Sequence, residues 1–449
     1  MSKKFSISRS QEIYERARNI IPGGSQTFSK GPTQFVNGFM PMYMDHAKGA
    51  YTWDVDGNKF LDYIMACHPI ILGHADDDVN NAVIKQLAKG STFSLMNELE
   101  VDVAELMVKY VPCAEAVRFG KNGADATTIG VKIARAVTGR EKIAYCGYHG
   151  WHDWFVANTD LNKGIPEFNK KLAHSFQYNN LDSLQKIFEE NKDEVAIVIM
   201  EPLTVLEPLN NFLHEVKKMA HHYGALLMFD EIITGFRFSI GGAQELVGVT
   251  PDLASFAKAI SNGVPLSAIT GKKEYMEGLG KDIFFSFTYG GDCIGLSAAK
   301  AAIPKIVACD VPKHLNAVGT ILKDGINNLS KQYDVYDYIK CLGYPCRTVV
   351  ALEGMGKFEA LELKSYFQQE MARGGVLWAA YHALSYSHSV EDMHYTLNVF
   401  EDAIKGFKKI LDNGQSLLSK IEGEPVKPVF RKVTDFNSFT VKDAQKART

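Results

Sequence analysis

Short apolar runs alternate with segments of helical periodicity through the middle of this chain, from about residue 76 onward. The apolar runs predict strands at Ala116–Phe119, Lys142–Cys146, Val195–Met200 and Ala225–Phe229. The intervening segments predict helices at Val79–Leu87, Glu100–Tyr110, Ala124–Thr138 and Phe212–Tyr223. Strands that are apolar on both faces and separated by helices indicate a mainly parallel sheet covered on both sides. We therefore expect an α/β fold.

The two ends of the chain show different patterns. Residues 9–20 predict a short amphipathic helix, which the Pro-Gly-Gly sequence at 22–24 would end. Residues 50–63 predict a hairpin, because the Asp-Gly-Asn sequence at 56–58 has turn chemistry between aromatic and β-branched residues. Beyond about residue 310 the helices and short strands are more polar, which indicates a second, α+β domain. A chain of 449 residues is also too long for one core of the usual size.

Composition narrows the function classes. Hydrophobic residues make up 46% and charged residues 22%, and the net charge of −3 gives no reason to propose a nucleic-acid or membrane-surface partner. No apolar run reaches the roughly 18 residues of a membrane-spanning helix, and the first residues lack the apolar core of a signal peptide, so we expect a cytoplasmic location. The seven cysteines are scattered without a Cys-x-x-Cys pair. They predict reduced thiols and no metal site.

A glycine-containing turn separates one predicted strand from the helix that follows it. In the run from Phe119 to Asp125, Gly123 allows a tight turn after which the first N–H groups of the helix point at one spot. Such a geometry binds phosphate through hydrogen bonds and the helix dipole. A plain strand-to-helix turn is the alternative reading of this motif taken alone.

Two further residues suggest how an organic cofactor would be held. Asp230 ends a predicted strand, where its carboxylate could bind a protonated ring nitrogen; a helix cap or a metal ligand are the alternatives. Lys258 follows an apolar strand-like run, where burial favours the neutral amine that can form a Schiff base; a surface lysine is the alternative. An anion site, a ring-nitrogen partner and a Schiff-base lysine together indicate pyridoxal phosphate.

Several ordered motifs resemble those of the class III aminotransferases. The run from Leu226 to Arg237 resembles their cofactor segment, and Pro251–Lys258 with the following Gly263-Val-Pro resembles their lysine segment. Shorter motifs match in order: Pro22-Gly-Gly, Trp53-Asp-Val-Asp-Gly, Leu72-Gly-His, Tyr148-His-Gly and Glu201-Pro202. The resemblance covers about residues 10 to 415 and is closest to the glutamate-1-semialdehyde 2,1-aminomutase-like branch.

The resemblance implies a fold and a domain organisation. The expected architecture is the fold-type I of pyridoxal-phosphate enzymes, with a large domain built on a mainly parallel seven-stranded sheet and a smaller α+β domain formed by the two chain ends. The expected segments are an N-terminal contribution to the small domain at 1–75, the large domain at 76–315, the C-terminal small domain at 316–420 and a surface tail at 421–449.

The resemblance also implies roles for individual residues. Tyr148 would stack on the cofactor ring, Ile232 would pack on the opposite face, and Asp230 would pair with the ring nitrogen. Lys258 would form the Schiff base and then move the proton as general base and acid. The expected cofactor-binding residues are Asn122, Gly123, Ala124, Tyr148, His149, Glu201, Asp230, Ile232, Lys258 and Thr288.

The phosphate turn departs from the family pattern, and a second subunit is expected to complete it. The family usually has Ser-Gly-Thr/Ser-Glu-Ala where this chain has Asn122-Gly-Ala-Asp-Ala, so a hydroxyl donor is missing at Ala124 and Asp125 replaces the usual glutamate. Phe287-Thr-Tyr-Gly-Gly-Asp resembles the segment whose threonine reaches the phosphate of the neighbouring subunit. That likeness implies a homodimer with Thr288 as a donor in trans; an ordinary loop hydroxyl is the alternative.

Substrate-facing positions differ more than the cofactor positions do. Where the aminomutases hold the substrate carboxylate with an arginine, this chain has Lys30, which lacks the bidentate fork. Their tryptophan before Gly-Pro is replaced by Cys67-His-Pro, and the stretch 381–388 lacks their C-terminal glutamate. The candidate substrate contacts are Lys30, Trp151 and His382.

These changes favour a conserved cofactor chemistry with a different substrate. We expect an aminotransferase that aminates a ketone or aldehyde. Aromatic residues such as Trp151 and Trp154 suit a sugar ring or another flat or extended substrate, with ordinary hydrophobic packing as the alternative for both. The resemblance implies that the substrate is a surface-polysaccharide precursor. The alternative function is the intramolecular aminomutase, and racemisation or decarboxylation share the first chemical step. A hypothesis from a different functional class is a non-catalytic binding protein that kept the fold.

Overall fold

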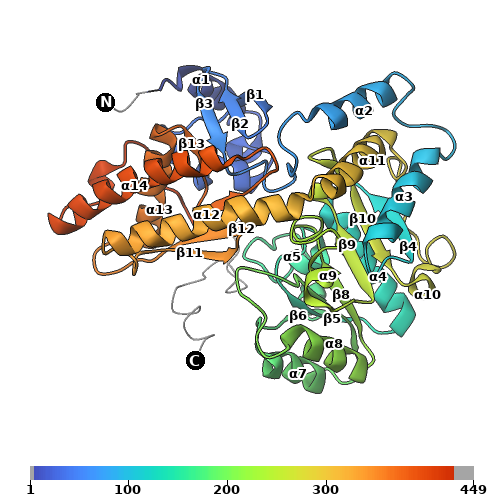
Figure 1. Cartoon of the computed structure of the whole chain (residues 1–449). Helices are drawn as coiled ribbons and strands as arrows, with labels where there is room; N and C mark the ends of the chain where they lie inside the picture. Colours follow the sequence, from blue (N-terminus) through green and yellow to red (C-terminus); the bar gives the residue numbers. More distant parts are fainter. Residues whose placement is uncertain (1–4, 429–449) are drawn as a thin grey trace. The chain divides into compact units, whose positions relative to one another are not determined.

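The computed structural model describes residues 5–428, which divide into two compact units (Figure 1). Of the described residues, one unit comprises 5–76 together with 313–428, and the other spans Asp77–Pro312. The predicted surface tail lies outside the described residues from 429 on. Its first part is packed rather than free, because Val426 is buried and its N–H donates to Ser365 Oγ at 3.0 Å.

The unit Asp77–Pro312 is built on a seven-stranded sheet of order β4-β10-β9-β8-β7-β5-β6. Its strands are β4 (Ala116–Gly120), β5 (Lys142–Cys146), β6 (Ala173–Ser175), β7 (Val195–Met200), β8 (Leu226–Asp230), β9 (Leu253–Phe256) and β10 (Ser267–Gly271). The pairs from β9 through β6 are parallel, whereas β10 runs antiparallel to both of its neighbours. Every residue of β7, β8, β9 and β10 is buried, which explains their continuous apolar character.

Helices cover this sheet, as Figure 1 shows for α4, α7 and α8. The helical elements of the unit are α2 (Asp77–Leu87), α3 (Glu98–Tyr110), α4 (Gly123–Thr138), α5 (Asp153–Val156), α6 (Glu167–Lys170), α7 (Leu181–Glu190), α8 (Phe212–His222), α9 (Ala243–Val247), η4 (Lys258–Ser261), α10 (Lys273–Met276) and α11 (Cys293–Ala308). The helix α4 presents Ile129, Ile133 and Ala134 to the core beneath the sheet. The predicted α/β architecture is therefore confirmed.

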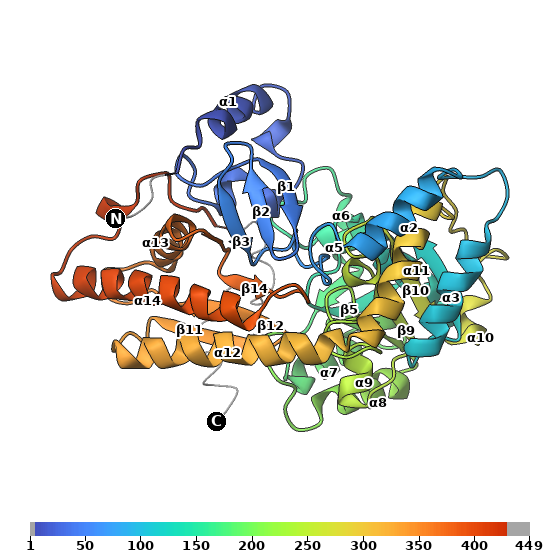
Figure 2. The ribbon, with the colours of Figure 1, turned by 45° about the horizontal axis from the view of Figure 1, so that its top comes forward.

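The other unit joins an N-terminal and a C-terminal part of the chain (Figure 2). Its four-stranded sheet has the order β1-β2-β3-β13, with β1 (Met44–Lys48), β2 (Tyr51–Asp54), β3 (Lys59–Asp62) and β13 (Val376–Leu377). The predicted hairpin is β2–β3, in which Asp54 Oδ1 accepts the N–H groups of Asp56 and Asn58 across the turn. β13 pairs parallel with β3, so a strand from the C-terminal part completes the N-terminal hairpin.

A second sheet and long helices complete this unit. The sheet has the order β11-β12-β14, with β11 (Ile339–Tyr344), β12 (Arg347–Leu352) and β14 (Tyr381–Ala383). The helices are α1 (Ser8–Ala17), α12 (Val311–Gln332), α13 (Ala360–Arg373) and α14 (Val390–Asp412), with short 3-10 turns at Pro22–Gly24, Phe28–Lys30, Pro32–Gln34 and Leu418–Lys420. Across residues 5–428, none of these helices is long and apolar enough to cross a membrane.

Candidate active site

Asp230 is held at the carboxyl end of β8 by contacts to both of its carboxylate oxygens. The Nδ1–H of His149 donates to Oδ2 at 2.8 Å. The hydroxyl of Ser255 donates to Oδ1 at 3.2 Å, and the N–H of Ile232 donates to the same oxygen at 3.1 Å. Asp230, His149 and Ser255 are all buried. A carboxylate held by these hydrogen bonds has its orientation fixed before a ligand binds.

His149 lies in the loop that follows β5, and its surroundings fix its ring. Its carbonyl accepts a hydrogen bond of 2.7 Å from Thr127 Oγ1 on α4. Its ring packs edge-on against Phe155 at 5.6 Å and parallel to Trp154 at 6.3 Å. The buried ring therefore supports Asp230 and does not face solvent.

Lys258 lies at the same edge of the sheet as Asp230. Asp230 pairs with Ser255 across β8 and β9, and Lys258 follows Ser255 by three residues. Its backbone φ of 49° is left-handed, which L-residues adopt at a cost of about 1–3 kcal/mol. Strain of this kind is concentrated at functional sites, where the surrounding structure holds it in place.

The predicted phosphate turn joins β4 to the N-terminus of α4. Asp125 Oδ2 accepts the N–H groups of Lys121 and Asn122 at 2.9 and 2.8 Å, which closes the turn. A Cβ on Gly123 would lie 2.6 Å from Ile232 Cδ1, so a larger residue would require the Ile232 side chain to move. The first N–H groups of this 16-residue helix and its dipole suit an anion.

The Tyr148-His-Gly loop packs directly on that turn. A Cβ on Gly150 would lie 2.7 Å from Ala124 Cβ, which shows how closely the two backbones approach. Tyr148 is partly exposed and meets Phe155 edge-on at 5.4 Å. Its N–H donates to Glu201 Oε1 at 3.1 Å, so Glu201 at the end of β7 supports this loop.

The two tryptophans of the adjoining segment differ in burial. Trp154 is buried and donates from Nε1 to Thr128 Oγ1 at 2.9 Å, so it is a packing residue. Trp151 is 69% exposed and contacts His152 edge-on at 4.7 Å. Thr288 is exposed in the irregular segment before α11. Trp151 and Thr288 are thus accessible on the described surface of their unit.

The remaining candidates belong to the other compact unit. Lys30 is exposed at the end of a 3-10 turn. His382 is buried, with Nδ1 bonded to Thr348 Oγ1 at 2.8 Å and Nε2 accepting from Trp378 Nε1 at 3.0 Å. Burial lowers the pKa of His382 to about 3. Both ring nitrogens are engaged, so His382 is a neutral core residue, contrary to the substrate contact expected for it.

Cys67, which the resemblance places where the aminomutases have a tryptophan, lies in an unusual turn of the same unit. Four consecutive residues from Met65 to His68 have positive φ values between 43° and 81°. Asp62 Oδ1 accepts the N–H groups of Ile64 and Met65, which supports the turn. The ring of His68 stacks on Tyr381 at 5.0 Å. Left-handed turns of non-glycine residues are strained, so this segment is shaped by its packing.

Sequence reasoning missed Ser255 and the role of Glu231. Glu231 is buried and accepts the N–H groups of Ala243 and Gln244 at 2.8 and 2.9 Å, which anchors the start of α9. Burial raises the pKa of this carboxyl. A lone serine inside an apolar strand was the available signal for Ser255, but its partner follows only from the β8–β9 pairing. Within residues 5–428, no group of three or more metal-ligating side chains forms a metal site.

Comparisons with known proteins agree with this geometry. The family model described as Aminotransferase class-III matches residues 35–391. A 3-aminobutyryl-CoA aminotransferase of Cloacimonas acidaminovorans (strain Evry) is 36% identical over 92% of this chain and 100% of its own length. A glutamate-1-semialdehyde 2,1-aminomutase of Alkaliphilus oremlandii (strain OhILAs) is 33% identical over 90% of this chain and 100% of its own.

Solved structures show the same fold over most of the chain. An omega-transaminase from Sphaerobacter thermophilus has a TM-score of 0.81 at 27% identity and covers 89% of this chain and 97% of its own. The FumI protein of Sphingopyxis sp. MTA144, solved with PLP, has a TM-score of 0.84 at 26% identity and covers 90% and 98%. The expected fold-type I architecture is confirmed by these similarities.

Proposed function

Because this chain belongs to the class III aminotransferase family and uses pyridoxal phosphate, we propose that it transfers an amino group between two small molecules. In this proposal, Asp230, Lys258 and the turn at Gly123 hold the cofactor. The observation that carries the proposal is the buried Asp230, whose oxygens are held by His149 and Ser255 beside the Lys258 segment. The residues present fit pyridoxal phosphate, because the N-terminus of α4, which suits a phosphate, and the carboxylate of Asp230, which suits a ring nitrogen, lie at one edge of the same sheet.

Each side chain has a defined task in this proposal. Bound pyridoxal phosphate supplies an electron sink for the carbon that carries the amino group. Asp230 pairs with the ring nitrogen and keeps it protonated, since a carboxylate favours the charged form of a nearby base. Lys258 attaches the cofactor and then takes and returns the proton of the reacting carbon. Tyr148 and Ile232 contact the two ring faces.

The phosphate is held by backbone donors in this proposal. Gly123 and Ala124 at the start of α4 donate their N–H groups, with Asn122 adjacent. Ala124 offers no hydroxyl, so the turn depends on its backbone geometry. Asp125 holds the N–H groups on the strand side of the turn, and this contact keeps the remaining donors directed at one spot.

The substrate differs from that of the aminomutases in this proposal. Lys30 and Cys67 replace the arginine and tryptophan of that branch, and the exposed Trp151 offers an aromatic face to a sugar or another extended ketone or aldehyde. The relative named as a 3-aminobutyryl-CoA aminotransferase supports transfer between two molecules. The relatives named as aminomutases support the alternative, an intramolecular transfer.

Members of this family are typically dimers, and we propose a homodimer in which Thr288 binds the phosphate of the partner's cofactor. Unit Asp77–Pro312 exposes large apolar side chains, among them Leu95 and Met96 at 80% and 84% exposure. Phe284 and Tyr289, on either side of Thr288, are also exposed. Exposed apolar groups of this size are typical of a protein interface.

Separate half-reactions test the proposal. The purified protein should be yellow, and borohydride should fix the cofactor to the peptide that contains Lys258 but not to the same peptide of K258A. Protein first loaded with an amino donor and freed of it should then aminate candidate keto compounds. A colourless protein that takes up no pyridoxal phosphate would refute the proposal. Product formed only from glutamate semialdehyde, without a second molecule, would establish the aminomutase.

A further inference from the structure

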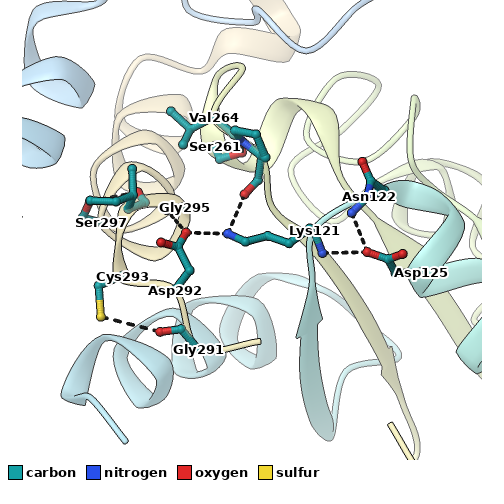
Figure 3. Close-up of polar contacts among 12 residues, drawn as sticks. Lys121, Asn122, Asp125, Ser261, Val264, Gly291, Asp292, Cys293, Gly295 and Ser297 are labelled. Atoms are coloured by element: carbon teal, nitrogen blue, oxygen red, sulfur yellow. Dashed lines mark hydrogen bonds and ion pairs between the residues drawn. The ribbon is translucent and has the colours of Figure 1, made fainter. Parts of the chain in front are cut away.

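Lys121 lies inside the phosphate turn, yet its ammonium group is directed away from the start of α4. It donates to the carboxylate of Asp292 and to the carbonyl of Pro265 at 3.1 Å (Figure 3). The side chains of Lys121 and Asp292 are 21% and 14% exposed. A charge-assisted pair that is mostly shielded from water is stronger than a surface pair.

Asp292 ends the segment that carries Thr288. Its Oδ2 also accepts the N–H of Gly295, so Asp292 is the N-cap of α11. The turn between them is closed by hydrogen bonds from Gly290 N–H to the Phe287 carbonyl and from Asp292 N–H to the Tyr289 carbonyl. The position of Thr288 therefore depends on where Asp292 is anchored.

Pro265 belongs to the segment that follows Lys258. Between them, the hydroxyl of Ser261 donates to the carbonyl of Val264 at 2.5 Å, which folds this segment back on itself. The Pro265 carbonyl accepts the Lys121 ammonium. One ammonium group therefore joins the phosphate turn, the lysine segment and the Thr288 segment.

We propose that Lys121 is a positioning residue, whose ion pair with Asp292 and hydrogen bond to Pro265 keep these three segments in the geometry that binds the cofactor. The inference rests on the proposed function for the role of the three segments. It assigns Lys121 to the protein scaffold and not to the phosphate, although a lysine in such a turn would by itself suggest a phosphate ligand. Arginine would keep the charge and part of the contact, whereas methionine would keep only the length.

Measurements of cofactor affinity distinguish the positioning role of Lys121 from direct phosphate binding, because the two roles predict opposite effects of D292N on that affinity. In the apo protein reconstituted with pyridoxal phosphate, K121M and D292N should each raise the dissociation constant roughly tenfold, and the double variant should be no worse than either alone. D292N retains an oxygen that can cap α11. If Lys121 bound the phosphate directly, D292N would release it and tighten binding while K121M weakened it, and that outcome would overturn the proposal.

Matched controls and a second measurement make the result specific. Lys305 on α11 pairs with Asp78 on α2 at 2.6 Å, and the two side chains are 25% and 68% exposed, so K305M removes a more exposed ion pair of the same unit, away from the phosphate turn. K305M and K121R should bind the cofactor within about twofold of the unchanged protein. Hydrogen exchange of the apo protein should increase at residues 121–126 and 284–292 in K121M and D292N only. Unchanged exchange in both variants would refute the proposal, even if the cofactor site lay elsewhere.

Discussion

The Nδ1–H of His149 donates a 2.8 Å hydrogen bond to the carboxylate of Asp230, and both side chains are buried at one edge of the sheet. A buried carboxylate needs such donors, because burying a polar group without hydrogen bonds costs free energy. Ser255 supplies the second side-chain donor to the same group. The strength of this arrangement can be measured through the cofactor that Asp230 is proposed to bind.

Replacing His149 with phenylalanine should weaken cofactor binding by about 10- to 100-fold, because a hydrogen bond to a charged group is worth about 1.5–3 kcal/mol. Fluorescence titration of the apo protein with pyridoxal phosphate measures the loss. His152 bonds Thr128 Oγ1 at 2.7 Å in the same segment, so H152F is the matched control. Equal losses in the two variants would show that the segment, and not the contact with Asp230, causes the effect.

The S255A variant should weaken binding less than H149F, by about fivefold, since its hydrogen bond of 3.2 Å is the longer of the two. S255T keeps the hydroxyl and should stay close to the unchanged protein. The same titration compares all three variants. Tighter binding in S255A would contradict the proposed role of this serine.

The G123A variant should lose both cofactor affinity and stability, because the added Cβ would lie 2.6 Å from Ile232 Cδ1. Overpacking of this kind typically costs about 1–3 kcal/mol. Adding I232A to G123A removes the clashing methyl group and should restore part of the thermal stability, as read from the unfolding midpoint. No recovery in the double variant would mean that the clash does not cause the defect.

The K258A variant should retain the fold but lose the covalent cofactor link, and proton transfer should slow by roughly 10²- to 10⁴-fold. Stopped-flow absorbance of one half-reaction measures the rate. Added methylamine, which replaces the missing amine in solution, should restore part of it. A variant with an unchanged rate would exclude Lys258 as the proton carrier.

Stability should fall on acidification because of two buried histidines. Burial lowers the pKa of His382 to about 3 and that of His388 to about 4, from a usual value of 6.5. The unfolded chain therefore binds protons that the folded chain does not, between pH 6.5 and pH 4 and below. Their stabilising contribution is complete above pH 6.5, and each residue should lose roughly 2 kcal/mol between pH 7 and pH 5.

Urea unfolding at the two pH values measures this loss. The H382Q variant, which cannot take up the proton, should be less stable at pH 7 but should show a smaller drop to pH 5. His214 is exposed on α8, so H214Q serves as the control substitution at a solvent-facing histidine. A drop in H382Q as large as in the unchanged protein would contradict the prediction.

Much of the fold could be predicted because its strands are recognisable one at a time. The predicted bounds of β5 and β7 equal those of the structure, those of β4 differ by one residue at its end, and those of β8 are shifted by one residue at both ends. The antiparallel strand β10 was not identified. Its apolar character is that of any buried strand, and periodicity does not carry strand direction.

The residues proposed to hold the cofactor could be selected from the sequence through their chemistry and their order. Asp230, Lys258 and the glycine turn stand at the ends of predicted strands, so a parallel sheet brings their positions to one edge. His382 shows the limit of that reasoning. A histidine in a polar stretch was expected at the substrate, but its partners Thr348 and Trp378 come from other parts of the chain and place it in a core.

The sequence by itself determined the α/β class and the cofactor and supplied the residues proposed to hold it, because these depend on residue type, local periodicity and chain order. Only the tertiary structure decided which groups support them. His149 and Ser255 on Asp230, and Asp292 and Pro265 on Lys121, are contacts between segments far apart in the chain. Such contacts depend on strand pairing and side-chain packing, which no local pattern encodes.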